Sequence, residues 1–245
     1  MPEPEPKIVL LAGASGLIGK SALDALLEAP DIGRVFAVTR RPLGREHPRL
    51  ANRIVQFETL EAQLKGMICH VAVCCLGTTL RQAGSEAAFR RVDIDYVLAF
   101  ARAAKAARAQ RFVVVSGAGA NPQSKNFQVR TKGEMEEALA GVGFESLDIL
   151  QPGPVLGFRS QMRPMDMGAW LVMPVVNPFL RGAREVFRGI SARALGAAIV
   201  GTTRSGRRGV QRYTHAGIQA LTKLKSARSA LTPDARTAAN NRQRG

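Results

Sequence analysis

The sequence has little of several features that would define other classes of protein. Its 245 residues include only three cysteines, of which Cys74 and Cys75 are adjacent in an expected buried strand. An odd number of cysteines in this setting predicts reduced core residues rather than a disulfide framework. No run of about 18 uncharged apolar residues is present to span a membrane. The first residues, Met-Pro-Glu-Pro-Glu-Pro, lack the basic and apolar regions of a secretory signal. The sequence therefore predicts a cytoplasmic protein without a membrane segment.

Histidines, aromatic residues and acids are also scarce. The three histidines, His47, His70 and His215, have no metal-ligand spacing with one another or with the cysteines, so no metal site is predicted. Basic residues outnumber acids by 35 to 19, for a net charge of +16. No aromatic residue on which a base could stack follows Tyr213 in the basic C-terminal region. Residues 226–245 are polar, lack a periodic apolar face and are predicted to be a disordered basic tail. These patterns argue against nucleic acid as a partner.

The most informative segment of the sequence is a glycine turn near its beginning. An apolar run over 7–12, which is typical of a buried strand, leads into Gly13, Gly16 and Gly19, and a helix-forming segment follows directly. Gly13 allows a tight turn, Gly16 allows phosphates to approach the backbone, and Gly19 allows the helix to pack closely on the strand. The helix N-terminus adds free N–H groups and a positive dipole end. An ordinary turn is the alternative, but the strand–glycine–helix order favours a site for a dinucleotide pyrophosphate.

Strand and helix patterns alternate along most of the chain. Strands are expected at 7–12, 34–39, 53–57, 70–76, 111–116 and 145–150, and helices at 17–29, 59–65, 86–109 and 131–141. This alternation predicts an α/β fold with a doubly wound parallel sheet, and residues 1–225 are expected to form one domain. Residues 155–225 are expected to form a small cap over the carboxyl ends of the strands. Within them, the apolar segment 165–180 suits a pocket wall or a homodimer surface equally well.

The end of the second expected strand indicates which dinucleotide is bound. Thr39, Arg40 and Arg41 stand where a site for NAD usually has an acid that accepts a hydrogen bond from the ribose 2′-hydroxyl. Two guanidinium groups can instead hold a 2′-phosphate, to which Ser15 can add a donor. Solvation of a loop is the alternative role for these arginines. The sequence favours NADP(H), and NAD(H) is the less favoured cofactor.

Several motifs together resemble a known family. They are Gly-Ala-Ser-Gly-Leu-Ile-Gly at 13–19, Leu-Gly-Thr-Thr at 76–79, Val-Asp at 92–93, Ser-Gly-Ala at 116–118, Lys-Gly-Glu at 132–134 and Gln-Pro-Gly-Pro at 151–154. This set resembles the atypical short-chain dehydrogenase/reductases of the Tat-interacting-protein type, including bacterial sugar-epimerase-like relatives, over roughly residues 7–225. The resemblance implies a Rossmann fold for the NAD(P)-binding domain. It places Lys132 at the nicotinamide ribose, and Pro152 and Gly153 beside the nicotinamide.

The predicted site therefore has a cofactor-binding part and a catalytic part. The cofactor-binding residues are Gly13, Ala14, Ser15, Gly16, Leu17, Ile18, Gly19, Thr39, Arg40, Arg41, Leu76, Gly77, Thr78, Lys132, Pro152 and Gly153. Lys132 and Ser116 are the candidate catalytic residues.

One residue argues against the family's usual chemistry. That chemistry uses a tyrosine four residues before the lysine to exchange a proton while hydride moves. Gln128 occupies this position, and an amide has no proton to exchange near neutral pH. The only tyrosines, Tyr96 and Tyr213, are expected in core or surface roles.

Two functions remain open on this reading. One is an NADP(H)-dependent oxidoreductase or epimerase-like enzyme acting on a carbonyl compound or nucleotide sugar. The other is a non-catalytic NADP(H)-binding or sensing module that acts through a protein partner.

Overall fold

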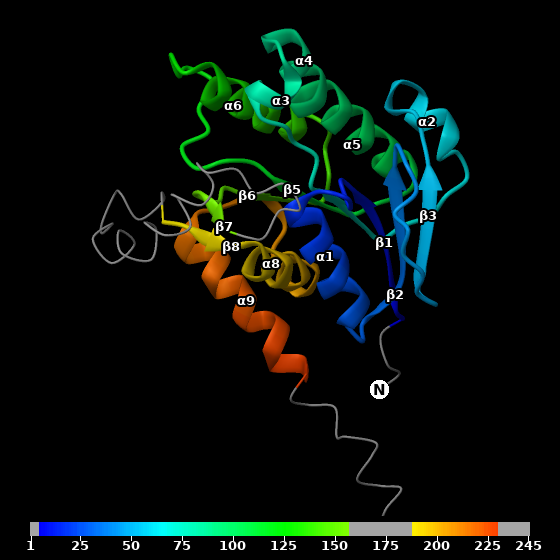
Figure 1. Ribbon diagram of the computed structural model, residues 1–245. Helices are drawn as coiled ribbons and strands as arrows, with labels where there is room; N and C mark the ends of the chain where they lie inside the picture. The colour runs from blue at the N-terminus through cyan, green and yellow to red at the C-terminus, as the bar shows by residue number, and fades with distance from the viewer. Residues whose placement is uncertain (1–4, 157–187, 230–245) are drawn as a thin grey trace, which may run out of the picture.

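A seven-stranded parallel sheet lies between two layers of helices in the computed structural model, which describes residues 5–156 and 188–229 (Figure 1). The strands are β1 (Lys7–Ala12), β2 (Ile32–Thr39), β3 (Leu50–Ile54), β4 (Val71–Cys74), β5 (Arg111–Val115), β6 (Ser146–Leu150) and β9 (Gly209–Tyr213). Their order is β3-β2-β1-β4-β5-β6-β9. The winding direction reverses between β1 and β4, where such sheets bind ligands. The predicted doubly wound α/β fold is confirmed.

Alternation along the strands divides the interior into two apolar cores. In β1, Val9 and Leu11 belong to one core, and Leu10 and Ala12 belong to the other. Because helices cover both faces, the strands are apolar on both sides, as in other parallel sheets. One layer contains α1 (Leu17–Glu28), α8 (Ala192–Arg204) and α9 (His215–Ser229). The other contains α2 (Leu60–Gln63), α5 (Tyr96–Ala106) and α6 (Phe127–Ala140).

The helix expected over 86–109 is interrupted. The structure has α3 (Leu80–Ala83), then α4 (Glu86–Arg90), a π-helical turn η2 (Arg91–Asp95) and α5. The Ser85 side chain caps α4 by accepting a hydrogen bond from the Ala88 N–H. The wider π turn changes which residues face inward, so Asp93 is fully buried. A regular helix was expected over 86–109, so the burial of Asp93 by a π turn was not predicted.

Two element boundaries were also predicted wrongly. The strand expected at 53–57 is β3, which pairs with β2 from Leu50 to Ile54 before the chain turns into the 3₁₀ turn η1 (Phe57–Thr59). The apolar residues after Ile54 are buried by that turn rather than by strand pairing. The helix expected from 131 begins four residues earlier, because the Asn126 side chain caps it by accepting from the Val129 N–H at 3.2 Å.

The C-terminal region adds to the sheet and its helical layer. β9 extends the sheet beside β6, and α8 packs against α1 and α9. Residues 192–213 therefore belong to the layers of the fold, in contrast to the cap expected over 155–225. The short strands β7 (Val155–Leu156) and β8 (Ile190–Ser191) pair at its start. Residues 226–229, expected to be disordered, are the last turn of α9. The segments 157–187 and 230–245, with most of the proposed pocket wall or dimer surface, lie outside the described residues.

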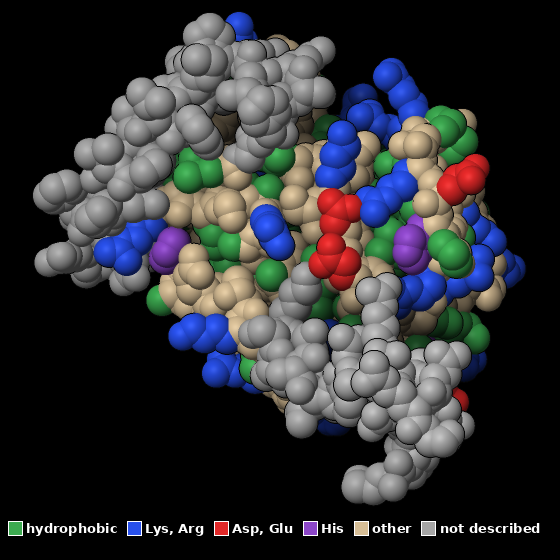
Figure 2. Space-filling model, turned by 60° about the horizontal axis from the view of Figure 1, so that its bottom comes forward, with side chains coloured by type: hydrophobic (Ala, Val, Ile, Leu, Met, Phe, Trp, Pro, Cys, Tyr) green, Lys and Arg blue, Asp and Glu red, His purple; other side chains and the backbone are tan. Residues whose placement is uncertain are grey.

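Basic side chains dominate the visible surface. Figure 2 shows Lys and Arg side chains spread over one face, with fewer Asp and Glu among them. The excess of positive charge is thus not confined to the C-terminal region. Among the helices of the described ranges, none is both long and apolar enough to cross a membrane.

We predict that Gly196→Ala destabilises the fold although alanine is the better helix former. A Cβ on Gly196 in α8 would lie 2.4 Å from the Ser21 carbonyl oxygen in α1, so the two helices would have to separate. We expect the free energy of unfolding to fall by about 1–3 kcal/mol in urea titrations. The control is Gly206→Ala, since a Cβ there meets no atom within 4 Å. Equal stability of the two variants would contradict this packing argument.

Candidate functional site

The glycine turn has the geometry that its spacing predicts. Gly13 has a φ of +82°, and a Cβ there would lie 2.5 Å from the carbonyl carbon and oxygen of Cys75. A Cβ on Gly19 would lie 1.9 Å from the Gly13 carbonyl oxygen. Gly16 is the N-cap of α1, where no side chain caps the helix and no acid lies in the first turn. The helix N-terminus is therefore left open to an anion from outside the chain.

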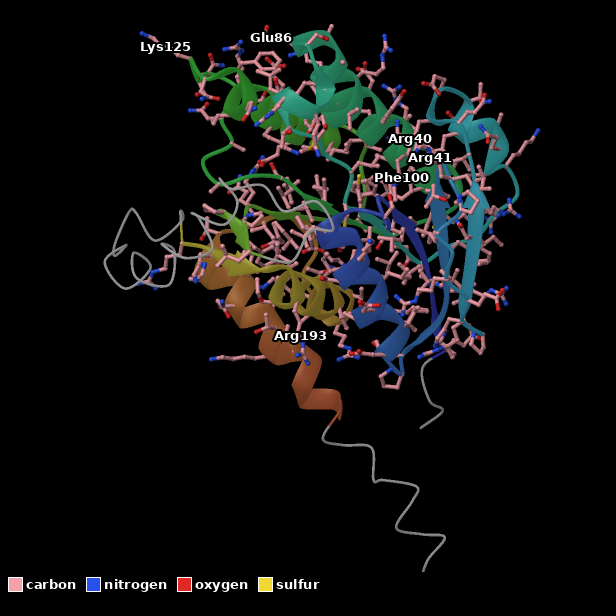
Figure 3. The ribbon with its side chains drawn as sticks, viewed as in Figure 1. Arg40, Arg41, Glu86, Phe100, Lys125 and Arg193 are labelled. Carbon is pink, nitrogen blue, oxygen red and sulfur yellow. The ribbon has the colours of Figure 1, made fainter. Side chains whose placement is uncertain are left out.

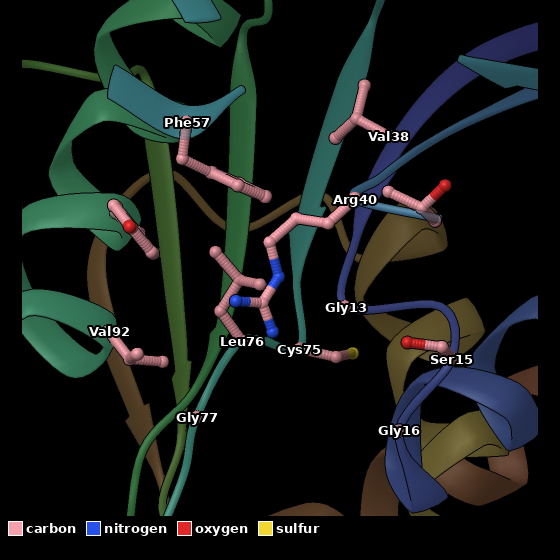
Figure 4. A pocket seen from close by; sticks show the side chains of 12 residues that line it. Gly13, Ser15, Gly16, Val38, Arg40, Phe57, Cys75, Leu76, Gly77 and Val92 are labelled. Carbon is pink, nitrogen blue, oxygen red and sulfur yellow. The ribbon is translucent and has the colours of Figure 1, made fainter. Parts of the chain in front are cut away.

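A pocket opens beside this turn, at the point where the sheet reverses its winding. The carboxyl ends of β1, β2 and β4 form three of its walls, and η1 and the π turn close it (Figure 4). The Arg40 guanidinium is directed into the pocket toward Leu76, on the side opposite Ser15. The lining residues are Gly13, Ser15, Gly16, Val38, Thr39, Arg40, Phe57, Cys75, Leu76, Gly77, Val92 and Tyr96.

The two arginines predicted to recognise a 2′-phosphate lie differently. Both follow β2 (Figure 3). Both are exposed, but Arg40 lines the pocket and Arg41 does not.

Other residues predicted to bind the cofactor instead pack beneath the glycine turn. Ala14 and Gly19 are buried, and Ile18 packs against the same core as Ala14. Leu17 is half-buried in the first turn of α1. These residues fix the glycine turn against the sheet.

Lys132 lies behind Gly77 of the pocket lining and pairs with a buried carboxylate. Its Nζ is 2.7 Å from Oδ1 of Asp93, which the π turn directs inward. The other oxygen of Asp93 accepts a hydrogen bond from the Thr78 N–H at 2.9 Å. A Cβ on Gly77 would lie 3.5 Å from Asp93 Oδ1 and 3.7 Å from Lys132 Nζ. The ion pair thus borders the pocket at Gly77 and connects α6, η2 and the turn after β4.

Ser116 is held by a second buried carboxylate, Glu136. The Ser116 hydroxyl donates to Glu136 Oε1 at 2.6 Å, and the Gln151 amide donates to the same carboxylate at 2.9 Å. Arg212 donates to Oε2 at 3.0 Å. The hydroxyl of Ser116, a candidate catalytic group, therefore donates its hydrogen bond to a buried carboxylate of the protein. This cluster joins the carboxyl ends of β5, β6 and β9.

Gln128, Lys132 and Glu136 follow one another at one-turn spacing on α6. Gln128 is exposed, Lys132 is half-buried and Glu136 is buried. The earlier start of α6 places Gln128 within the helix, so it shares a face with the lysine. Pro152 and Gly153 follow β6, and the Pro152 carbonyl accepts from the Ala118 N–H at 2.9 Å. These residues lie at the carboxyl edge of the sheet but do not line the pocket.

The two tyrosines have different surroundings. Tyr96 lines the pocket, although a core or surface role was expected, and its hydroxyl donates to Glu58. That hydrogen bond raises the pKa of the Tyr96 phenol, which keeps it protonated. Tyr213 is buried and donates to Asp148 at 3.0 Å, as a core residue. Both phenols thus donate to carboxylates of the protein, Glu58 and Asp148.

Sequence reasoning missed Asp93, Glu136, Glu58 and Phe57 as parts of the site. Asp93 belongs to the recognised Val-Asp motif at 92–93, and Glu136 follows the Lys-Gly-Glu motif at 132–134 by two residues, so a sequence signal was present. Burial also raises the pKa of the Cys75 thiol in the pocket wall. Among the described residues, no group of three His, Cys, Asp or Glu side chains is arranged to hold a metal ion.

The strand order, the glycine turn and the open helix N-terminus define a Rossmann-type dinucleotide-binding protein. A family model described as NAD(P)H-binding matches residues 13–145. The chain is 37% identical to protein HTATIP2 of Rattus norvegicus over 67% of this chain and 68% of the relative. It is 33% identical to the mitochondrial protein FMP52 of Saccharomyces cerevisiae over 78% and 81% of the two chains. The chain therefore belongs to the NAD(P)H-binding family of atypical short-chain dehydrogenase/reductases, as the motifs predicted.

Solved structures show the same fold at low sequence identity. A UDP-N-acetylglucosamine 4-epimerase from Methanobrevibacter ruminantium is 17% identical, with a TM-score of 0.64 over 86% of this chain and 77% of that one. A uronate dehydrogenase from Agrobacterium tumefaciens is 16% identical, with a TM-score of 0.57 over 84% and 75%. At this identity the likeness establishes the fold alone.

The predicted cytoplasmic location is contradicted by the relatives. The fungal FMP52 proteins, which are 29–33% identical to this chain, are named as mitochondrial. The prediction rested on unpaired cysteines and on the lack of a signal-like N-terminus. Free thiols are compatible with any reducing compartment, so they did not discriminate between the cytoplasm and the mitochondrion.

We predict that Asp93→Asn destabilises the protein by about 3 kcal/mol, because it leaves the Lys132 charge without its buried partner. The substitution keeps the shape of the side chain, so a packing defect would not account for the loss. Asp95→Asn is the control, since Asp95 is exposed on the same π turn. Urea titration would measure both variants, and equal stabilities would contradict a structural role of the ion pair.

Proposed function

We propose that this protein binds NADP(H) in preference to NAD(H). The observation that carries the proposal is the Arg40 guanidinium inside the pocket that the glycine turn begins. A guanidinium recognises a phosphate by charge-assisted, bidentate hydrogen bonds. In a doubly wound sheet the end of β2 lies beside the adenosine ribose when the pyrophosphate lies on the glycine turn.

The described residues support the placement of the pyrophosphate and of both riboses of such a cofactor. The cradle at Gly13 and Gly16 leaves room for phosphates, and the uncapped N-terminus of α1 faces them. We place the nicotinamide ribose toward Lys132, which the Asp93 carboxylate holds beside Gly77. The bound nicotinamide would supply the capacity for hydride transfer.

A second candidate is a cofactor-binding module without turnover of its own. It is supported by Gln128 in the tyrosine's position and by the engagement of Ser116 with Glu136. Neither side chain then offers a proton to a substrate near the nicotinamide. In this case cofactor occupancy would signal to a protein partner. The enzymatic alternative is an oxidoreductase or epimerase-like reaction on a carbonyl compound or nucleotide sugar.

We predict that Arg40→Ala weakens NADPH binding about ten- to a hundredfold, since it removes charge-assisted hydrogen bonds to the phosphate. NADH binding should change little, because a 2′-hydroxyl does not need the guanidinium. Arg41→Ala is the matched control and should bind NADPH as the unmodified protein does. Isothermal titration calorimetry measures all of these dissociation constants. Equal loss of NADPH binding in both variants, or no loss in either, would contradict the assignment of Arg40 as the group that binds the 2′-phosphate.

We also predict that Gln128→Tyr distinguishes the two candidate functions. NADPH oxidation would be followed at 340 nm with a panel of aldehydes, ketones and nucleotide sugars. Activity gained only by the variant indicates that the rest of the site is competent and supports the module without turnover. Turnover by the unmodified protein supports the enzyme instead. Gln128→Phe serves as the control, because it adds the ring without the hydroxyl.

A further inference from the structure

An acidic residue, Glu58, lies at the edge of the pocket. It follows β3, whereas the acid of an NAD site is expected at the end of β2. The end of β2 supplies arginines, but β3 lies beside β2 in parallel register, with Ile54 opposite Thr39. The Val55 N–H donates to the Thr39 carbonyl at 2.8 Å, so the chain leaves β3 next to Arg40. It then enters η1, which contains Phe57 and Glu58.

Two aromatic residues of the pocket wall fix the position of Glu58. The Tyr96 hydroxyl donates to Glu58 Oε1 at 2.5 Å. The Tyr96 ring stacks on Phe57 with ring centroids 5.1 Å apart. Tyr96, Phe57 and Arg40 all line the same pocket. The Glu58 carboxylate is thus held at the pocket edge, although it is exposed to solvent.

The charge of Glu58 lies within electrostatic reach of two arginines. The hydrogen bond from Tyr96 lowers the pKa of the Glu58 carboxyl, and the guanidinium groups of Arg91 and Arg40 lower it further. Glu58 is therefore an anion throughout the physiological range of pH. It stands close to the guanidinium proposed to receive the 2′-phosphate.

We propose that Glu58 is a second determinant of cofactor selectivity, which opposes Arg40. Its carboxylate can accept a hydrogen bond from a free ribose 2′-hydroxyl, and it repels a 2′-phosphate. The protein then has two opposing determinants of selectivity, with the attractive group for NADP(H) directly after β2 and the repulsive group after β3. The result is a preference for NADP(H) that is weaker than Arg40 alone would give. This inference rests on the proposed function, because it places the adenosine ribose beside Arg40.

The test is Glu58→Gln, which keeps the shape and the acceptor oxygen and removes the charge. We expect the dissociation constant of NADPH to fall and that of NADH to rise or stay constant. The ratio of the two should shift toward NADPH by about fivefold to tenfold at low ionic strength. Glu61→Gln is the matched control, since Glu61 is an exposed acid on the adjacent α2 and does not line the pocket. Because Glu58 is exposed, the variant is not expected to unfold, and a thermal melt without cofactor checks this.

The outcomes separate this inference from the proposed function. An unchanged ratio in Glu58→Gln, a shift toward NADH, or an equal shift in Glu61→Gln overturns the role of Glu58. If Arg40→Ala leaves NADPH binding intact, the proposed function fails, whatever the result for Glu58. A salt titration adds a further readout: the shift in ratio should shrink as ionic strength rises, whereas a structural effect of the substitution would persist.

Discussion

The close approach of the glycine turn to the end of β4 is the constraint on which the pocket depends. A side chain at Gly13 would overlap the Cys75 carbonyl, and one at Gly19 would overlap the Gly13 carbonyl. Both obstacles are backbone atoms, which cannot move aside as the tip of a flexible side chain can. These contacts therefore fix the separation of β1, β4 and α1. The same separation sets Ser15 and Leu76 on opposite walls of the pocket.

Helix α6 organises the other end of the site by carrying two buried or half-buried charges on one face. Lys132 pairs with Asp93, and Glu136 accepts from Ser116 after β5, Gln151 after β6 and Arg212 within β9. Gly133 lies between them, where a Cβ would be 2.2 Å from the Pro122 nitrogen. The lysine and the glutamate thus hold strand ends together whether or not a proton is transferred nearby. The residues of the Lys-Gly-Glu motif therefore have structural roles of their own, since Lys132 pairs with Asp93, Gly133 packs on Pro122 and Glu134 pairs with Arg90.

The sequence predicted the features that depend on local spacing. The doubly wound parallel sheet and the function of Gly13 and Gly19 could be inferred because glycine spacing and strand–helix alternation are encoded by neighbouring residues. The partners of Lys132 and Ser116 could not, because both depend on elements distant in sequence. The π turn was the main obstacle: it shifts Asp93 inward against the regular helical period. Glu58 was missed for a related reason, since strand pairing places it near Arg40 across 18 positions of the chain.

Affinity and selectivity for the dinucleotide have different physical origins in this protein. The net charge of +16 attracts any polyphosphate at long range, but salt screens that field over about 8–10 Å. This field attracts both NADP(H) and NAD(H), because both are anions. Discrimination between NADP(H) and NAD(H) must therefore come from charges beside the adenosine ribose 2′ position, where the two cofactors differ. On the described surface of the pocket, Arg40 lies in the wall, and Glu58 is fixed at the edge through Tyr96. In the proposed binding mode, the glycine turn holds the pyrophosphate, and the balance of the exposed charges of Arg40 and Glu58 determines the preference between NADP(H) and NAD(H).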